Sequence, residues 1–215
     1  MNNYGFDKVY KQDLLVPNWK RGDKEVARII DSKEDLSVLA LGMSVPTPKD
    51  GIKAKILEVQ RLEDLEILGR ENIEGKIVFF NRPTDQRLIT TGSAYGGEVD
   101  QRAEGPSMAA EYGAIGVVIR SVGTAFDDVP HTGGTKYKDG ITKIPAAALG
   151  VKSADRLTSA LRENPNTELF MKMNCRTLKD APSHNVIGEL TGKEFPDKII
   201  TVSYTHLRAH ETADN

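Results

Sequence analysis

The segment Gly75-Lys76-Ile77-Val78-Phe79-Phe80 carries an uninterrupted run of β-branched and aromatic residues. Such a run predicts a strand that is buried on both faces of a sheet. The strand is expected to end at Asn81-Arg82-Pro83, because proline has no N–H to donate to a β-ladder. A second run, Ile115-Gly116-Val117-Val118-Ile119, predicts a second strand.

The residues between these two runs include a predicted helix over 106–113. Pro106 suits the first turn of a helix, and Gly113 suits the left-handed conformation that often ends one. A strand, a helix and a second strand in this order indicate a compact crossover unit.

Other segments on either side extend the alternation of strands and helices. Residues 51–59 and 167–173 alternate between apolar and polar side chains, which predicts two half-buried strands. Residues 153–161 place their apolar side chains on one face of a predicted helix. Residues 144–150 predict an edge strand, because Pro145 would remove a hydrogen bond from a central one. The predicted fold class is therefore α/β, of mixed α+β type.

The N-terminal flank differs from this centre. Residues 8–30 predict a hairpin that turns at Arg21-Gly22-Asp23, and its strands are expected to lie on a neighbouring structure. Leu36 to Pro48 predicts another strand, which ends in a Pro-x-Pro linker.

The C-terminal flank predicts the start of a second domain. Residues 176–183 are polar and contain a proline, which is typical of a connection that closes a domain. New strands are then expected at 185–190 and at 197–200.

The composition excludes several classes of protein. The chain has 215 residues, with 29 basic and 31 acidic side chains and a net charge of -2. We expect no nucleic-acid partner, because such a partner usually requires a clustered basic excess. No run of about 18 apolar residues is present, so no membrane span is expected. Cys175 is the single cysteine, which excludes an internal disulfide and a cysteine-based zinc site.

Familiar catalytic motifs do not occur in the sequence. Neither Gly-x-Gly-x-x-Gly nor Gly-x4-Gly-Lys-Ser/Thr is present, which disfavours a phosphate-binding loop. The nearest match to a nucleophile elbow, Gly42-Met43-Ser44-Val45-Pro46, has the wrong residue at its last position. We therefore assign no catalytic residue.

The histidines are the remaining candidates for chemistry, and they are His131, His184, His206 and His210. His206 and His210 would share one face of a helix, which is the most metal-like pattern in the chain. A loop histidine is usually solvated, but loops on a rigid scaffold also carry binding groups. We therefore take His131, Thr132 and Gly133 as candidate substrate-proximal residues, and we assign no metal ligand.

Several segments together resemble the protease-associated domain that is inserted in zinc-dependent exopeptidases of the M28 family, in the carboxypeptidase Q-like branch. Each segment is weak alone, but their order and spacing are specific. The matching segments are Leu41-Gly42-Met43-Ser44-Val45-Pro46-Thr47-Pro48, residues 74–81, residues 109–121, Pro130-His131-Thr132-Gly133, residues 143–147 and residues 185–192.

The resemblance implies an organisation and an activity. Residues 1–48 would be strands or a hairpin of the peptidase core, 49–175 the protease-associated domain, and 176–200 the first strands of the catalytic domain. The parent enzyme would use two zinc ions to hydrolyse short peptides, with the protease-associated domain as a lid over the active-site cleft. It would be secreted or periplasmic, although residues 1–5 carry no signal-peptide pattern, and a homodimer is a further expectation.

The sequence departs from the family after Ile200. The family continues into Gly-His-x-Asp-Ser, whose histidine is the first zinc ligand, whereas this chain reads Thr201-Val202-Ser203-Tyr204-Thr205-His206. Residues 201–215 resemble the translation of a DNA-library adapter, so we exclude this tail, with His206 and His210, from the fold. We expect a fragment that is truncated before the metal site, binds no zinc and is inactive.

A second interpretation is a stand-alone protease-associated domain that acts as a protein or peptide interaction module. A membrane span or RING-type cysteines downstream would favour this module, whereas Gly-His-x-Asp would favour the peptidase. A third interpretation is a polypeptide without a function as written, whose unpaired core strands would make it prone to aggregate.

Overall fold

The computed structural model describes residues 5–202 and divides the chain into two compact units. The larger unit is Pro17–Lys179, and the smaller one joins residues 5–16 with residues 180–202. The assignment of residues 1–48 to the peptidase core, 49–175 to the protease-associated domain and 176–200 to the catalytic domain stays a prediction.

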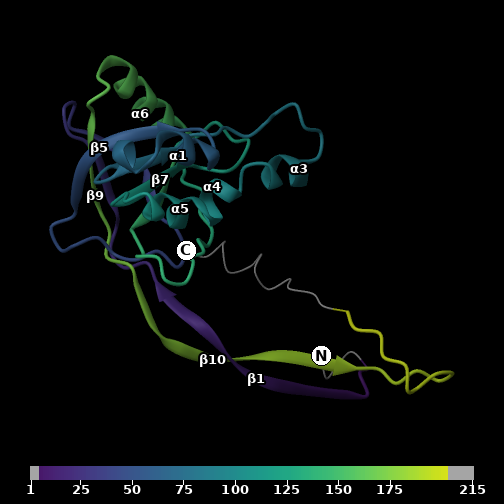
Figure 1. Cartoon of the computed structure of the whole chain (residues 1–215). Helices are drawn as coiled ribbons and strands as arrows, with labels where there is room; N and C mark the ends of the chain where they lie inside the picture. Colours follow the sequence, from purple (N-terminus) through teal and green to yellow (C-terminus); the bar gives the residue numbers. More distant parts are fainter. Residues whose placement is uncertain (1–4, 203–215) are drawn as a thin grey trace. The chain divides into compact units, whose positions relative to one another are not determined.

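The larger unit is built on an eight-stranded sheet with the order β3-β2-β9-β5-β6-β7-β8-β4 (Figure 1). Its strands are β2 (Val26–Ile29), β3 (Glu34–Leu36), β4 (Val38–Ala40), β5 (Ile52–Val59), β6 (Ile77–Phe80), β7 (Gly116–Arg120), β8 (Ala146–Leu149) and β9 (Glu168–Lys172). The central strands β5 to β8 are parallel to one another, while β9 and β4 pair with them in the antiparallel sense.

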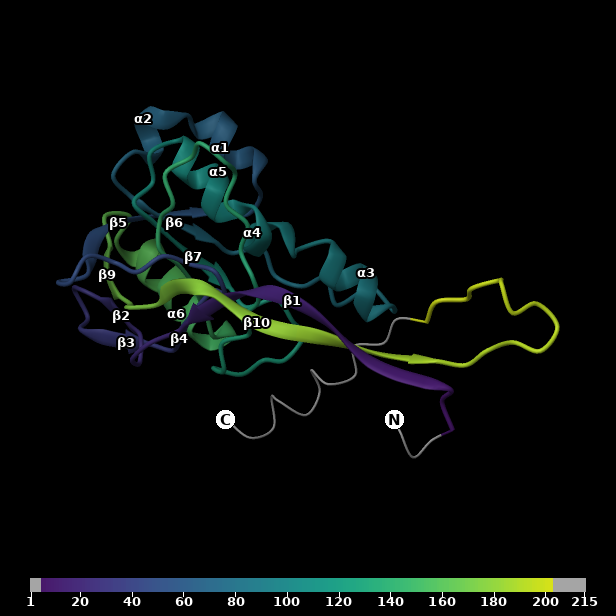
Figure 2. The same cartoon turned by 90° about the horizontal axis from the view of Figure 1, so that it is seen from below.

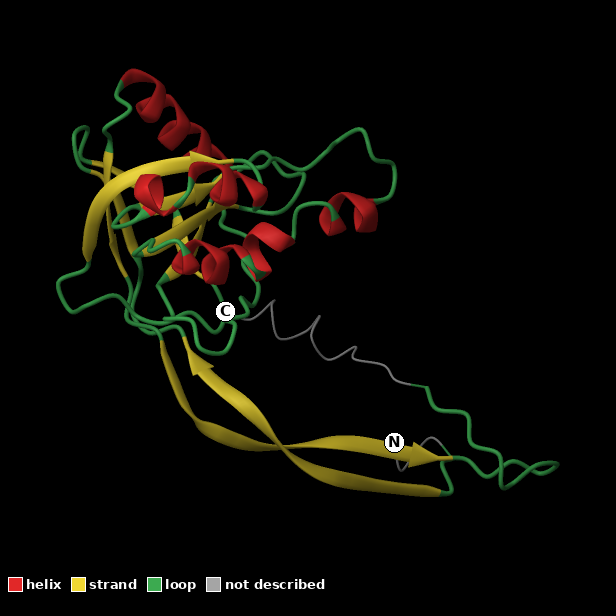
Figure 3. Cartoon of the chain, viewed as in Figure 1, coloured by secondary structure: helices red, strands yellow, loops and turns green. Residues whose placement is uncertain are grey.

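Helices cover both faces of this sheet (Figures 2 and 3). They are α1 (Glu63–Leu68), α2 (Arg70–Ile73), α3 (Thr91–Gly96), α4 (Asp100–Ala103), α5 (Gly105–Glu111) and α6 (Val151–Glu163). Leu65, Ile73 and Ala109 bring α1, α2 and α5 into one hydrophobic cluster. Ala154 and Leu157 bring α6 into a second cluster on the other face. The predicted mixed α/β (α+β) class is confirmed.

Strand β6 is buried on both faces of the sheet, as its sequence predicts. All four of its residues are inaccessible to solvent. Its last two residues, Phe79 and Phe80, belong to the two different hydrophobic clusters. The predicted helix before β7 is also confirmed, with Pro106 in the first turn of α5 and a φ of +86° at Gly113. The strands predicted at 51–59 and 167–173 and the helix predicted at 153–161 are present as β5, β9 and α6.

The prediction that residues 144–150 form an edge strand is wrong. Strand β8 lies between β7 and β4, and it pairs with both. Pro145 precedes the first strand residue, so its missing N–H removes no bond of the ladder. Its carbonyl still accepts a 2.9 Å hydrogen bond from the N–H of Val117.

The predicted hairpin over residues 8–30 is also wrong. Strand β1 (Lys8–Lys20) pairs with β10 (Arg176–Glu189), whereas β2 joins β9 and β3. Gly22 does turn the chain, with a φ of +91°. However, the side chain of Asn174 holds this turn, because it accepts from the N–H of Asp23 (2.7 Å) and donates to its carboxylate (2.6 Å).

Two expectations for the C-terminal flank need correction as well. The predicted polar connection at 176–183 is the first half of β10, which continues through the strand expected at 185–190. Residues 197–200 form no strand. In the N-terminal flank, the strand predicted from Leu36 to Pro48 is not continuous, because β3 ends at Leu36 and β4 covers only Val38–Ala40. The polar residues of β10 stay extended because β1 satisfies their backbone, which outweighs their low strand propensity.

No helix within residues 5–202 has the length and apolar character needed to cross a membrane.

The double burial of β6 leads to a test of stability. We expect Phe80→Ala to lower the free energy of unfolding by about 3 to 5 kcal/mol, because it leaves a cavity between β6 and α5. The same change at Phe126, whose side chain is 68% exposed, should cost less than about 0.5 kcal/mol. Urea denaturation of both variants measures the difference, and equal losses would contradict the assignment of β6 to the core.

Candidate functional site

The parallel strands β5, β6 and β7 end at the same edge of the sheet, at Val59, Phe80 and Arg120. In open α/β sheets, ligands bind in the crevice outside the carboxyl ends of the strands. Two cavities lie at this edge, and the loop that follows β6 contributes to both of them. This edge is therefore the candidate binding site of the larger unit.

The larger cavity has a volume of about 530 Å³. Its charged lining consists of Arg61, Arg82, Asp85, Arg87 and Glu98. Asp85 forms two hydrogen bonds with the guanidinium of Arg87 (2.9 and 2.8 Å), so these two charges neutralise each other. Arg82 is likewise paired, with Asp100, so Arg61 and Glu98 are the charged residues of this lining whose side chains have no hydrogen-bond or ion-pair partner among the described residues.

Glu98 is an unusual carboxylate in this lining. The residue is 2% exposed, and neither carboxylate oxygen has a hydrogen-bond partner among the described residues. The neighbouring Thr84 hydroxyl donates instead to the carbonyl of Gly123 (2.7 Å). Burial raises the pKa of Glu98 above its usual value, although Thr84, Arg82 and Arg120 oppose the increase. An ionised carboxylate in this position lacks the donors that it needs.

Both backbone polar groups of Arg82 form hydrogen bonds with one buried side chain. The side chain of Gln101, which is fully buried, accepts from the N–H of Arg82 (3.3 Å) and donates to its carbonyl (3.1 Å). The guanidinium pairs with Asp100, while its Nε atom is buried and has no hydrogen-bond partner within residues 5–202. Burial lowers the pKa of Arg82, and the nearby charge of Arg61 lowers it further.

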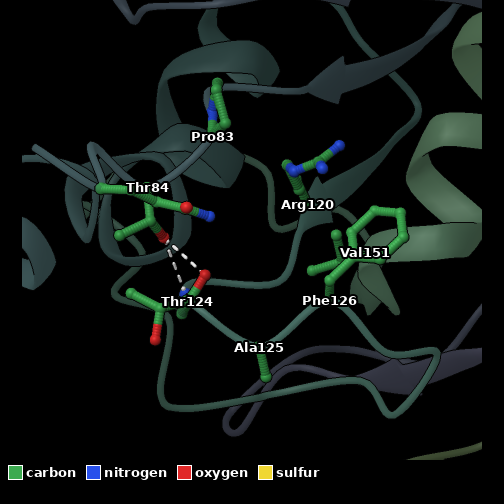
Figure 4. Close-up of a pocket in the computed structure, with 9 residues that line it drawn as sticks. Pro83, Thr84, Arg120, Thr124, Ala125, Phe126 and Val151 are labelled. Carbon is green, nitrogen blue, oxygen red and sulfur yellow. Dashed lines mark hydrogen bonds between the residues drawn. The ribbon is translucent and has the colours of Figure 1, made fainter.

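The smaller cavity, of about 50 Å³ (Figure 4), shares Pro83, Thr84 and Gln86 with the lining of the larger one. The Thr84 hydroxyl joins its two sides, since it also accepts from the N–H of Gly123 (3.0 Å). Arg120, at the end of β7, donates to Asp155 (2.7 Å) and to Asn81 (3.2 Å). These bonds connect the loops after β6 and β7, which fixes the wall that the two cavities share.

The predicted substrate-proximal residues lie together in one loop, away from the lining of either cavity. His131 is exposed, and its N–H donates to the Ser121 hydroxyl (2.8 Å). The carbonyl of Gly133 accepts from the N–H of Gly42 (2.9 Å), whose own carbonyl accepts from the N–H of Thr135 (2.9 Å). The loop is thus fixed through its backbone, and the side chain of His131 is left free.

The other two residues of this loop are partly buried. A Cβ atom at Gly133 would lie 2.6 Å from the guanidinium carbon of Arg102, so glycine permits this close approach. Arg102 in turn donates to the hydroxyl of Tyr95 and lies over its ring at 5.3 Å from the centroid. The loop therefore rests on α4, and Arg102 links it to α3.

Metal-binding and nucleophilic side chains do not gather in this part of the chain. Within residues 5–202, no three His, Cys, Asp or Glu side chains form a group that could hold a metal ion. His206 and His210 lie outside the described residues. Burial raises the pKa of the Cys175 thiol to about 11, and its Sγ donates to the carbonyl of Ser44 (3.3 Å), so this cysteine is structural.

The sequence did not reveal Arg61, Arg82 and Glu98 as site residues. Arg82 could have been suspected, because it follows a strand that was predicted to be buried, at the edge where ligands bind. Glu98 carries no such signal, because it lies between two short helices in a polar segment.

Comparison with known proteins places this fold. No family model matches the chain. Carboxypeptidase Q of Bos taurus is 32% identical over 199 residues, which are 93% of this chain and 40% of the relative. The crystal structure of a peptidase M28 precursor from Shewanella amazonensis SB2B is 35% identical with a TM-score of 0.82, and the match covers 89% of this chain and 43% of that one.

Along this segment, the chain belongs to the M28 peptidases of the carboxypeptidase Q-like branch.

A further solved structure shares the fold at lower identity. A zinc aminopeptidase from Bacillus subtilis matches with a TM-score of 0.52 at 19% identity, over 88% of this chain and 38% of that one. This likeness shows the fold alone. The chain spans about 40% of the length of the curated carboxypeptidase Q relatives that it matches.

The buried carboxylate of Glu98 should make the stability of the folded chain depend on pH. Because the pKa of Glu98 is raised in the folded state, the native protein binds more protons than the unfolded one, and stability falls as the pH rises from the ordinary value of 4.5 through the raised value. We expect Glu98→Gln to flatten this decline and to stabilise the protein at neutral pH by on the order of 1 kcal/mol.

Thermal unfolding between pH 4 and pH 8 would measure this effect, with Glu194→Gln as the control because Glu194 lies in an exposed loop. A Glu98→Gln variant less stable than the wild type at neutral pH would show that the carboxylate is satisfied in the folded protein.

Proposed function

We propose that this chain is part of an exported zinc-dependent exopeptidase that hydrolyses short peptides, with residues 49–175 as a protease-associated lid over the active-site cleft. The observation that carries the proposal is the 32% identity with carboxypeptidase Q over 93% of the chain. The structural match to an M28 peptidase precursor over 89% of the chain supports it.

The proposal assigns the metal to another part of the parent protein. Residues 5–202 bring together no set of three potential ligands, so they do not fit a catalytic zinc site, which takes at least three protein ligands. We propose that two zinc ions are held by the region of the relatives that this chain does not span. The chain by itself is then inactive as a peptidase.

The lid role rests on the loop that contains His131. Its backbone is bonded to the segment at Gly42 and to Ser121, so the loop has a defined position. The side chain of His131 is exposed and free to contact a peptide at the rim of a cleft. A binding group on a loop that a rigid sheet supports is a common arrangement in enzymes.

The first test uses the full-length protein encoded by the source gene and, in parallel, the present chain. We expect the full-length protein to hydrolyse dipeptides, to lose this activity on treatment with 1,10-phenanthroline and to recover it with zinc. The present chain should show no hydrolysis and no stoichiometric zinc by elemental analysis. A full-length protein without peptidase activity would overturn the proposal and favour an interaction module.

A second test addresses the lid. In the full-length enzyme, His131→Ala should lower kcat/KM for a dipeptide about fivefold, which corresponds to the loss of one polar contact worth about 1 kcal/mol. Lys136→Ala, an exposed change farther along the same loop, should leave kcat/KM unchanged. Unaltered dipeptide turnover in the His131 variant would count against a place for this residue beside the substrate.

A further inference from the structure

We propose that Asp128 is a positioning residue, which fixes His131 by anchoring the chain before it to the N-terminal end of α6. The anchored stretch is residues 123–134, called here the His131 segment, in the loop between β7 and β8. Its part in substrate binding rests on the proposed function, whereas the anchoring is a property of this chain and can be measured on it.

The His131 segment has no apolar anchor. None of the residues 123–134, all of which the structure describes, is buried. The large apolar side chains of Phe126 and Val129 are 68% and 62% exposed. A segment without buried apolar contacts opens at low cost unless hydrogen bonds hold it. The position of the His131 segment therefore depends on its polar contacts.

Asp128 supplies the side-chain contacts between this segment and α6. Its Oδ1 accepts from the N–H of Ser153 (2.8 Å), in the first turn of α6, and its Oδ2 accepts from the guanidinium of Arg156 (3.0 Å). The carbonyl of Asp127 accepts from the N–H of Lys152 (3.0 Å). Burial alone would raise the pKa of Asp128, but the bonds from Ser153 and Arg156 outweigh it and lower the pKa, so the carboxylate is ionised at neutral pH.

The segment also packs closely against the start of α6. A Cβ atom at Gly150, the residue before this helix, would lie 2.6 Å from the carbonyl carbon of Asp128. The φ of Gly150 is -57°, which any residue adopts, so the close approach and not the backbone conformation requires glycine here. Farther along the segment, Phe126 lines the smaller cavity together with Val151 of α6 (Figure 4).

The anchor lies directly before the residue that it positions. Three residues after Asp128, the N–H of His131 donates to the hydroxyl of Ser121 (2.8 Å). Among the described residues, the hydrogen bonds of 124–130 to the rest of the chain are those of Asp127 and Asp128. Loss of the Asp128 carboxylate therefore leaves one backbone bond to hold this stretch, and the position of His131 is no longer fixed.

Hydrogen exchange of the 215-residue chain at pH 7 tests the anchoring. In Asp128→Ala, the amides of residues 124–131 should exchange at least roughly tenfold faster than in the wild type. Asp128→Asn should show a smaller increase, because it keeps an acceptor for the N–H of Ser153. Glu34→Gln is the matched control, because it removes the other carboxylate that pairs with Arg156 (2.6 Å) and leaves the segment untouched.

A second variant approaches the same contact from the helix. Gly150→Ala retains the carboxylate of Asp128 but introduces a methyl group where the segment lies, so it should also speed exchange at 124–131. Urea denaturation of each variant verifies that it is folded.

A double-mutant cycle in the full-length enzyme tests the positioning role. A carboxylate that only stabilised α6 would act independently of His131, whereas a positioning residue acts through it. We expect Asp128→Ala to lower kcat/KM for a dipeptide about fivefold, like His131→Ala, and the double variant to lose no more than about fivefold. Independent effects would multiply to about 25-fold.

Each part of the inference has its own contrary result. Equal exchange at 124–131 in the wild type and in the folded Asp128→Ala and Gly150→Ala variants overturns the anchoring. Unaltered kcat/KM in Asp128→Ala, or a loss of about 25-fold in the double variant, overturns the positioning role. An unaltered full-length protein without peptidase activity overturns the proposed function and the substrate role of this segment, while hydrogen exchange still decides the anchoring.

Discussion

Burial of β6 between two parallel neighbours and two hydrophobic layers is the constraint on which the larger unit depends. Its four residues are inaccessible, and its backbone pairs with β5 on one side and β7 on the other. Phe79 and Phe80 point into different clusters, so helices are needed on both faces. The crossover through α5 and the packing of α6 both follow from this requirement. A strand that is apolar on both sides is shielded from water only when helices cover both faces of the sheet.

The same constraint positions the polar chemistry. Parallel strands bring their carboxyl ends to one edge, where the chain must leave the sheet through polar loops. Thr84 joins the loops after β6 and β7, and Arg120 connects β7 to Asn81 and Asp155. The edge is therefore a connected wall, and it holds a buried carboxylate at Glu98 that no described neighbour satisfies. Unsatisfied buried charge is costly, which is why such groups are more often found at sites of function.

The relation to the M28 peptidases gives this unit a place in a larger protein. The chain matches carboxypeptidase Q over 93% of its own length but 40% of that relative. The described residues supply a rigid sheet, a fixed loop at His131 and a charged cavity, without a cluster of metal ligands. In the proposed function, the metal chemistry and the access to it lie in different parts of the parent protein.

The sequence by itself determined the elements whose character is local. The apolar run of β6, the proline and glycine at the ends of α5 and the alternation in β9 depend on neighbouring residues, and each was predicted. The motif order also indicated the family. Only the tertiary structure decided that β1 pairs with β10 and that β8 is an interior strand, because a strand's partner is set by residues far away in the sequence. The cavity at Glu98 has the same origin, since its charges come from three separate loops that only folding brings together.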